Sequence, residues 1–328
     1  MSDFKKLSLD ETCQKIISAK NPVIAIHRSP DGDALGSAVA LFHVFSALGM
    51  KASYICADEI PERLEFLRGD MTDTPSAPYS ECDIICLDVA SPAQLGKLPE
   101  RVPEVASPYL MIDHHAVGEQ FADNYVIADA CATGEIIFDI AKRLAEMKKI
   151  DGITEEMAVG MYAAISSDSG CFKYSNTKPH THEVASELVA LGINSAEINR
   201  LLFDSKSENV LRAEGLALSK MRTYCNGEVN AVCITKTERE AMGLKFEHFE
   251  TSIDVVRALR GIKIAVAIKQ QDDGVFKVSM RSTGADVAKI CAKFGGGGHI
   301  RASGCSLSAK DENEAIGLII SAIEEELK

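Results

Sequence analysis

Short apolar runs bounded by turn residues alternate with longer helical stretches in the first half of the chain. Four runs predict buried β-strands: residues 22–26, 51–57, 83–87 and 109–112. Three stretches predict helices: residues 34–48, 133–147 and 154–165. Gly49 follows the first helix as its expected C-cap, and Thr133 and Thr154 are the expected N-caps of the others. Strands that alternate with helices predict βαβ units and a mostly parallel sheet.

The second half has a different pattern. Residues 181–221 read as polar helices with a break at 205–209. Four apolar runs then predict strands at residues 230–235, 263–269, 275–280 and 301–308. Two further stretches predict helices, at residues 286–294 and at the C-terminal end of the chain. The predicted fold class is α/β, with an N-terminal mostly parallel sheet flanked by helices and a smaller C-terminal α/β domain with a mixed sheet. We expect domains at 1–185 and 223–328, joined by a helical connector at 186–222.

The composition is that of a globular protein. The chain has 328 residues, enough for two cores, and 46% of them are hydrophobic. The N-terminus shows no apolar signal region and no apolar run approaches the roughly 20 residues that span a bilayer, so we expect a cytoplasmic protein without membrane contact. Ten cysteines without a CxxC pair favour buried reduced thiols. The net charge of -13 disfavours long duplex nucleic acid and favours a short anionic substrate.

Asp113, His114 and His115 are the first candidates for chemistry. They stand at the end of the apolar run 109–112. Neutral imidazole is a common metal ligand, and a neighbouring carboxylate selects the ring nitrogen that binds. Because ligands of parallel sheets sit beyond the carboxyl ends of the strands, this position favours a metal site.

Three further segments offer carboxylates and one more histidine. They contain His27, Asp31 and Asp33 after the first strand, Asp88 after the third, and Asp168 after a helix. Carboxylates with imidazole suit Mn²⁺ or Mg²⁺. Each segment alone also fits a turn or helix cap, and for Asp168 the turn is the stronger interpretation. The residues alone leave these alternatives open.

Together, these four segments resemble the DHH phosphoesterase superfamily in order and spacing. The C-terminal segments 279–282, 295–299 and 301–304 resemble the DHH-associated C-terminal domain. The resemblance covers residues 15–308, and its motifs are specific only as a set. Within the superfamily the chain is similar to the nanoRNase/pAp phosphatase (NrnA-like) group.

The resemblance implies two divalent metal ions and a role for each residue. One ion would be held by His27, Asp31 and Asp88, and the other by Asp33, Asp88, His114 and Asp168. His115 would face the substrate phosphate, and Asp113 would orient the histidines. Mn²⁺ is the favoured metal, with Mg²⁺ or Co²⁺ as alternatives. Two cations roughly 3.5–4 Å apart would activate a water as hydroxide for in-line attack on phosphorus.

The resemblance also implies a substrate site in the C-terminal domain. Glycines let backbone N–H groups approach an anion closely. The implied substrate-binding residues are Arg281, Ser282, Gly296, Gly297, Gly298, His299 and Arg301. A glycine run by itself is more typical of a flexible loop.

The expected function is that of an enzyme of the oligoribonuclease or 3′(2′),5′-bisphosphate nucleotidase type. It would trim short oligoribonucleotides to mononucleotides and dephosphorylate 3′-phosphoadenosine 5′-phosphate (pAp). One alternative is a phosphodiesterase for cyclic di-AMP or its linear product pApA. A different class is a nucleotide sensor without turnover, which the complete ligand set disfavours. RecJ-type exonucleases and family II pyrophosphatases fit less well. The closing helix and the connector leave a homodimer open.

Overall fold

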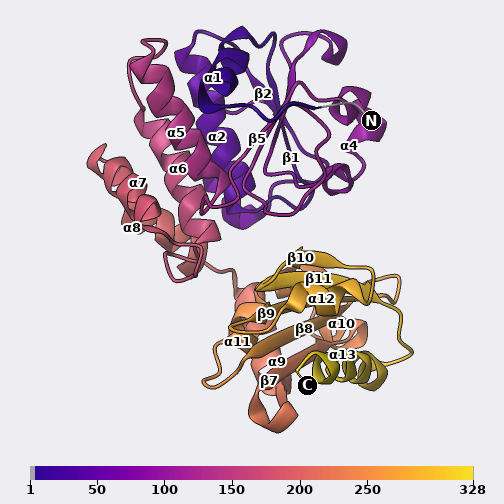
Figure 1. Cartoon of the computed structure of the whole chain (residues 1–328). Helices are drawn as coiled ribbons and strands as arrows, with labels where there is room; N and C mark the ends of the chain where they lie inside the picture. Colours follow the sequence, from indigo (N-terminus) through magenta and orange to yellow (C-terminus); the bar gives the residue numbers. More distant parts are fainter. Residues whose placement is uncertain (1–3, 328) are drawn as a thin grey trace. The chain divides into compact units, whose positions relative to one another are not determined.

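The computed structural model describes residues 4–327 and divides the chain into two compact units, Met1–Ser205 and Lys206–Lys328 (Figure 1). Each unit has a sheet and hydrophobic clusters of its own. The division falls inside the stretch 186–222 for which the sequence predicts a separate connector. Helices before the division pack with the first unit, and the helix after it packs with the second.

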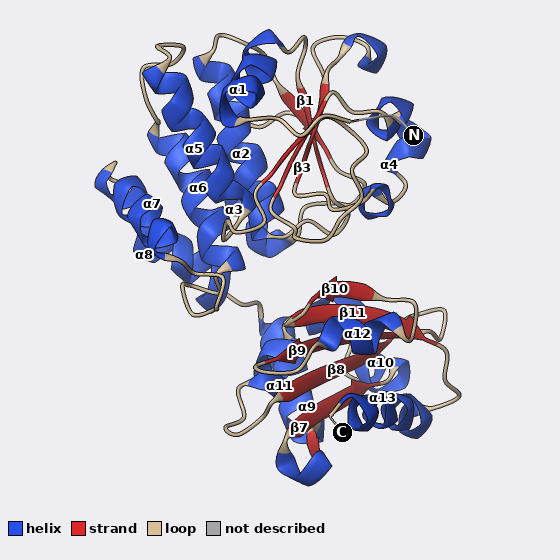
Figure 2. Cartoon of the chain, in the orientation of Figure 1, coloured by secondary structure: helices blue, strands red, loops and turns tan. Residues whose placement is uncertain are grey.

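A five-stranded parallel sheet forms the centre of the first unit (Figure 2). Its order is β2-β1-β3-β4-β5, with bounds Ser53–Ile55, Val23–Ile26, Ile84–Leu87, Leu110–Asp113 and Asn124–Val126. Strands β1, β3 and β4 are buried along their whole length, as their continuous apolar sequence predicts. The sheet confirms the predicted strands and adds β5, which the sequence pattern did not reveal.

The longer helices cover one face of this sheet, and the short helix Leu98–Arg101 with 3-10 turns covers the other (Figure 1). The helices are α1 (Leu9–Ser18), α2 (Gly32–Ala47), α3 (Glu65–Arg68), α4 (Leu98–Arg101), α5 (Thr133–Glu146), α6 (Glu155–Asp168), α7 (Pro179–Ala190) and α8 (Ser195–Asn199). A π-helical turn (Arg200–Asp204) follows α8, and 3-10 turns lie at Glu62–Leu64, Tyr79–Glu81, Pro92–Leu95 and Pro103–Ala106. The backbones of α2 and α6 lie in close contact at Gly36 and Gly160. A Cβ on Gly36 would lie only 2.5 Å from the Gly160 carbonyl oxygen, so this contact requires glycine.

The second unit contains a six-stranded mixed sheet in the order β10-β11-β9-β8-β7-β6. The bounds in that order are Gly297–His299, Ala302–Leu307, Phe276–Ser282, Ile264–Gln270, Val229–Ile234 and Arg222–Tyr224. Only β7 and β8 pair in parallel. The helices are α9 (Glu208–Lys220), α10 (Lys236–Ala241), α11 (Ser252–Arg257), α12 (Val287–Ala292) and α13 (Glu312–Glu326), with 3-10 turns at Cys225–Gly227 and Phe246–Phe249.

Two other features follow from the sequence. The ten cysteines of the described chain are all free thiols, and five of them are buried hydrophobes in core clusters that include Cys86 and Cys233. None of the helices within residues 4–327 combines the length and apolar character needed to cross a membrane.

Candidate metal centre

The carboxyl ends of three neighbouring parallel strands bring histidines and aspartates to one edge of the first sheet. His27 follows β1, Asp88 follows β3, and Asp113 closes β4 immediately before His114 and His115. Since parallel neighbours end on the same side, residues far apart in sequence become adjacent without any long loop.

The N-terminus of α2 supplies two more carboxylates. Asp31 is its N-cap, and one carboxylate oxygen accepts hydrogen bonds from the N–H groups of Asp33 and Ala34, both at 3.0 Å. Asp33 lies in the first turn and is buried. The start of α2 therefore fixes both carboxylates at the carboxyl end of the sheet. Asp31 caps this helix, and the cap leaves its carboxylate free to be a metal ligand as well.

Asp33 also caps a second helix from outside. Its Oδ2 accepts from the Thr133 N–H at 2.8 Å, and its Oδ1 accepts from the Gly134 N–H at 3.1 Å and the Ser37 hydroxyl at 2.9 Å. The predicted N-cap role of Thr133 is wrong. The N-cap of α5 is Ala132, which offers no side-chain cap, and the carboxylate of Asp33 satisfies the first N–H groups instead.

The imidazole of His27 faces Asp31 and Asp88. Its Nε2 lies 3.8 Å from Asp31 Oδ1 and 3.5 Å from Asp88 Oδ2. The other nitrogen, Nδ1, lies 2.8 Å from the Arg28 carbonyl oxygen and donates to it in the neutral tautomer. The lone pair of Nε2 then points towards the carboxylates, which is the arrangement of a metal-binding histidine.

His114 repeats this arrangement on the other side of Asp88. Its Nδ1 lies 3.3 Å from the Ala130 carbonyl oxygen, and its Nε2 lies 3.6 Å from Asp33 Oδ2 and 3.8 Å from Asp168 Oδ2. Ligand atoms of Asp33, His114 and Asp168 lie within 4.8 Å of one another, as do those of His27, Asp31 and Asp88. The structure thus gathers the predicted ligands into two adjoining sets.

Asp88 stands between the two sets. Its Oδ2 faces His27, while its Oδ1 lies 3.6 Å from His114 Nε2 and accepts from the Thr133 hydroxyl at 3.2 Å. The residue has a left-handed φ of 58°, and its N–H donates to the Ile112 carbonyl at 3.0 Å. Asp and Asn are the non-glycine residues that tolerate this conformation best, and they occupy it often at functional sites.

Asp113 contacts the two consecutive histidines. Its buried Oδ1 accepts from His115 Nδ1 at 2.6 Å and from the His114 N–H at 2.8 Å. His115 Nδ1 also lies 3.6 Å from Asp88 Oδ1, and Asp88, His114 and His115 form a third set within 4.8 Å. The short bond to Asp113 places a proton on His115 Nδ1.

The crowded carboxylates shift one another's proton affinities. Burial, and then the charge of Asp88, raise the pKa of Asp33, while burial raises the pKa of Asp168 to about 6. Burial lowers the pKa of His114, but the Asp33 and Asp88 charges outweigh it and raise that pKa to about 9. The same competition, between burial and the Asp31 and Asp88 carboxylates, raises the pKa of His27 to about 12. Without cations, the cluster therefore holds protons in their place.

This donor chemistry fits two divalent cations. The set with His27 and the set with Asp33 each combine one imidazole nitrogen with two carboxylates, and Asp88 is close to both. Mixed oxygen and nitrogen donors suit Mn²⁺ and its neighbours. Buried carboxylates with raised pKa values gain most from a cation, because the cation removes their mutual repulsion.

Residues 130–134 contact three of the six proposed ligands, and the sequence analysis does not predict this role. The Ala130 carbonyl contacts His114, the Thr133 hydroxyl contacts Asp88, and the Thr133 and Gly134 N–H groups contact Asp33. A Cβ on Gly134 would lie 2.4 Å from the Ala164 Cβ, so only glycine fits. All four contacts use backbone atoms or a hydroxyl that any turn could contain. The one signal was the run of small residues before an apolar helix.

The residues predicted to bind substrate lie at one end of the second sheet. Arg281 and Ser282 close β9, and Arg281 pairs across the sheet with Ala302. The Ser282 hydroxyl and Arg301 Nη1 both donate to the Ala285 carbonyl oxygen, at 2.5 and 3.0 Å. The side chain of His299 lies outside the described residues.

The glycine run is a strand for part of its length, not only a loop. Gly297 and Gly298 belong to β10 and pair with Gly304 and Ser303 of β11. A Cβ on Gly296 would lie 2.2 Å from the Gly304 carbonyl oxygen, and one on Gly298 would lie 2.7 Å from the Ala302 oxygen. Close packing therefore requires two of these glycines, independently of any ligand.

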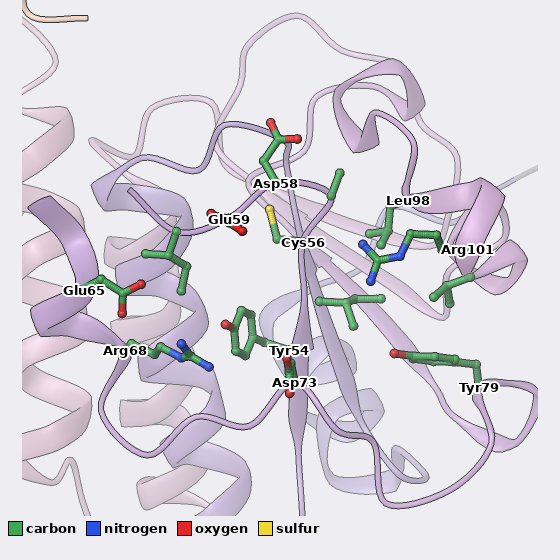
Figure 3. Close-up of a pocket in the computed structure, with 14 residues that line it drawn as sticks. Tyr54, Cys56, Asp58, Glu59, Glu65, Arg68, Asp73, Tyr79, Leu98 and Arg101 are labelled. Atoms are coloured by element: carbon green, nitrogen blue, oxygen red, sulfur yellow. The ribbon is translucent and has the colours of Figure 1, made fainter. Parts of the chain in front are cut away.

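A cavity of about 410 Å³ lies beside the C-terminal end of β2, and none of the predicted site residues lines it (Figure 3). Figure 3 shows Arg68 and Arg101 entering it from opposite sides, near Tyr54 and Tyr79. Four carboxylates share the lining with these two guanidinium groups: Asp58, Glu59, Glu65 and Asp73. Positive and negative side chains lie together in this cavity, so its lining favours no single class of ligand. We therefore assign the chemistry to the cluster of histidines and aspartates at the carboxyl ends of β1, β3 and β4.

Comparisons with known proteins agree with this placement. Residues 21–165 match the DHH family N-terminal domain, and residues 246–328 match the DHHA1 domain. The chain is 31% identical to a bifunctional oligoribonuclease and PAP phosphatase NrnA from Thermus thermophilus, covering 93% of this chain and 89% of that protein. It is 27% identical to the protein of the same name from Bacillus subtilis, over 89% of this chain and 92% of that one. A crystal structure of an exopolyphosphatase-related protein from Bacteroides fragilis superposes with a TM-score of 0.85 and 25% identity, over 97% and 95% of the two chains.

Proposed function

We propose, on the premise that this chain belongs to the DHH phosphoesterase family, that it cleaves short oligoribonucleotides to mononucleotides and dephosphorylates pAp. The observation that carries the proposal is the position of Asp88, whose two oxygens face two separate sets of imidazole and carboxylate ligands. The relatives from Thermus thermophilus and Bacillus subtilis, which carry both activities in their names, match over most of this chain and support the choice of substrates.

The chain's own residues would bind and orient the reacting groups. When bound, two divalent cations, for which we propose Mn²⁺, would supply Lewis-acid activation of a water and of the phosphoryl oxygens. His27, His114 and the four aspartates of the two sets would hold them. Burial lowers the pKa of His115, but the hydrogen bond from its Nδ1–H to Asp113 outweighs burial and raises that pKa, which favours the imidazolium. We propose that the imidazolium gives its Nε2 proton to the leaving oxygen and becomes neutral.

The second unit would supply a binding site for a phosphate or nucleotide. We propose that Arg281, Ser282, Arg301, His299 and the glycines of β10 contact a phosphate or nucleotide. The hydrogen bonds of Ser282 and Arg301 to one carbonyl oxygen, that of Ala285, keep both side chains at the same end of the sheet. A guanidinium group there suits phosphate, because its N–H groups match the phosphoryl oxygens.

A second candidate is hydrolysis of cyclic di-AMP or pApA. It is supported by a cyclic-di-AMP phosphodiesterase GdpP from Geobacillus thermodenitrificans, which is 24% identical over 94% of this chain. This chain spans 48% of that protein's length. The NrnA-named relatives match over nearly their full length, so we rank this candidate second. A nucleotide sensor without turnover is the alternative of a different class, and the complete ligand sets argue against it.

A substrate panel tests the proposal. The purified chain is incubated with Mn²⁺ and pAp, pApA, a five-nucleotide RNA, cyclic di-AMP or pyrophosphate, and products are separated by ion-exchange chromatography. We expect turnover of pAp and the RNA, and no turnover after chelation of the metal. Preference for cyclic di-AMP or pApA would establish the second candidate, and tight binding without hydrolysis would leave a sensor.

A further inference from the structure

Asp168 lies at the end of a helix where a carboxylate is disfavoured. It is the last residue of α6, and the next residue, Ser169, is the helix C-cap. Unpaired carbonyl groups make a helix C-terminus partly negative, which disfavours a carboxylate there. Asp31 is held by N–H groups of its own helix and Asp33 by those of α5, but α6 offers Asp168 nothing comparable.

Asn176 supplies this support from the loop that follows. Its side-chain Nδ2 lies 3.3 Å from Asp168 Oδ2, 3.1 Å from the Asp168 carbonyl oxygen and 3.1 Å from the Cys131 carbonyl oxygen. All three neighbours are acceptors, so the amide must present its NH₂ group to them. Asp168 Oδ2 is the same oxygen that faces His114 Nε2. The amide therefore holds the oxygen that lies in the ligand set.

The loop reaches this position through a strained turn. Gly170, Cys171 and Phe172 follow one another with left-handed φ angles of 57°, 57° and 61°. Left-handed backbone costs a residue with a Cβ roughly 1–2 kcal/mol. The strained residues with a Cβ are Cys171 and Phe172, three and four positions after Asp168, and the turn leads the chain back towards the cluster. Such strain persists only where the surrounding contacts determine the conformation.

Hydrogen bonds to the end of α6 determine this turn. The Cys171 N–H donates to the Ser166 carbonyl at 2.7 Å, and the Phe172 N–H donates to the Ser169 hydroxyl at 2.9 Å. The Lys173 and Tyr174 N–H groups both donate to the Ser169 carbonyl, at 2.9 and 3.0 Å. The turn is thus fixed on its helix, and it places Asn176 between Asp168 and the residues 130–134 that hold His114 and Asp33.

We propose that Asn176 is a positioning residue that orients Asp168 for one of the two cations, the one held by Asp33, His114 and Asp168. This inference rests on the proposed function. Asn176 joins Asp168 to the Cys131 carbonyl, one residue from the Ala130 carbonyl that orients His114. An aspartate in its place would add a fifth carboxylate and remove the donor. Loss of a group that orients a metal ligand lowers metal affinity by roughly 10–100-fold.

A purely structural role for Asn176 makes a different prediction. If its amide only ties the loop to the helix, truncation should lower stability and leave the affinity for metal unchanged. Asn124 provides a matched control, since it is buried in β5 of the same unit and its Nδ2 donates to the Ala122 carbonyl at 3.1 Å, away from the cluster.

The test is calorimetric titration of Mn²⁺ into the metal-free full chain, with thermal unfolding of each variant alongside. We expect two equivalents bound by the unaltered chain, one of them weakened roughly 10–100-fold in Asn176→Ala and neither weakened in Asn124→Ala. Equal affinities in Asn176→Ala and the unaltered chain would overturn the inference alone, as would equal weakening in Asn124→Ala. No Mn²⁺ binding by the unaltered chain would overturn the proposed function and this inference with it.

Discussion

Replacing Asp88 by asparagine should lower turnover by orders of magnitude with little effect on the fold. One carboxylate oxygen faces His27 at 3.5 Å and the other faces His114 at 3.6 Å, so Asp88 belongs to both ligand sets. An amide keeps one acceptor oxygen and loses the charge. At least one cation position then loses a carboxylate ligand. If the lost stabilisation of the transition state is about 4 kcal/mol, turnover falls on the order of 10³-fold.

The backbone decides which substitution isolates this effect. Asp88 has a φ of 58°, which asparagine adopts more readily than alanine. We expect Asp88→Asn to change the stability of the metal-free chain by about 1 kcal/mol or less, because losing the charge weakens the attraction to His27 and His114 but also removes the repulsion of Asp33. Asp88→Ala should lose roughly 1–2 kcal/mol more, from left-handed strain.

The assay compares product release from pAp at increasing Mn²⁺ with urea unfolding of the same proteins. Asp83→Asn is the control. Asp83 lies at the opposite end of β3 from Asp88, and its carboxylate accepts a hydrogen bond from the Lys20 N–H at 2.7 Å, away from the cluster. The control should keep its activity. The reasoning is refuted if Asp88→Asn retains activity within tenfold of the unaltered chain with the same requirement for Mn²⁺.

Further predictions concern the pH dependence and the glycine run. Burial raises the pKa of Asp168 to about 6 from its ordinary 3.8, so the folded metal-free chain holds a proton that the unfolded chain releases, and stability falls as pH rises through that interval. Thermal unfolding between pH 4 and 6 should show a smaller loss in Asp168→Asn, and an equal loss would contradict the assigned shift. Gly296→Ala should destabilise the second unit by about 1–3 kcal/mol in urea unfolding, because its Cβ would lie 2.2 Å from a carbonyl oxygen. Gly297→Ala meets no atom within 4 Å, so it should leave stability unchanged and raise the KM for pAp, whereas an unchanged KM would exclude close approach of substrate there.

Continuous burial makes three strands of the first sheet easy to predict from the sequence. Residues 22–26, 83–87 and 109–112 match β1, β3 and β4 within one residue, because a strand covered on both faces must be apolar throughout. The sequence does not predict strands β5, β6 and β10, because each has three residues and little apolar character. Pairing with a neighbour creates such strands, and their own sequence carries no sign of it.

The candidate metal ligands could be identified from the sequence for a related reason. A charged residue directly after a buried strand is conspicuous, and His27, Asp88 and Asp113 all stand there. The groups that orient these ligands could not be identified from the sequence. The Ala130 and Cys131 carbonyls and the Thr133 and Gly134 N–H groups are backbone atoms that every residue possesses. Only the fold shows that they point at the cluster.

The central claim is that the cluster binds two cations, with Asp88 between them. Crystals of the chain grown with Mn²⁺ and measured at the manganese absorption edge test this directly. We expect two anomalous peaks, one among His27, Asp31 and Asp88 and one among Asp33, His114 and Asp168, with Asp88 contacting both. A single peak, or peaks away from Asp88, would contradict this claim.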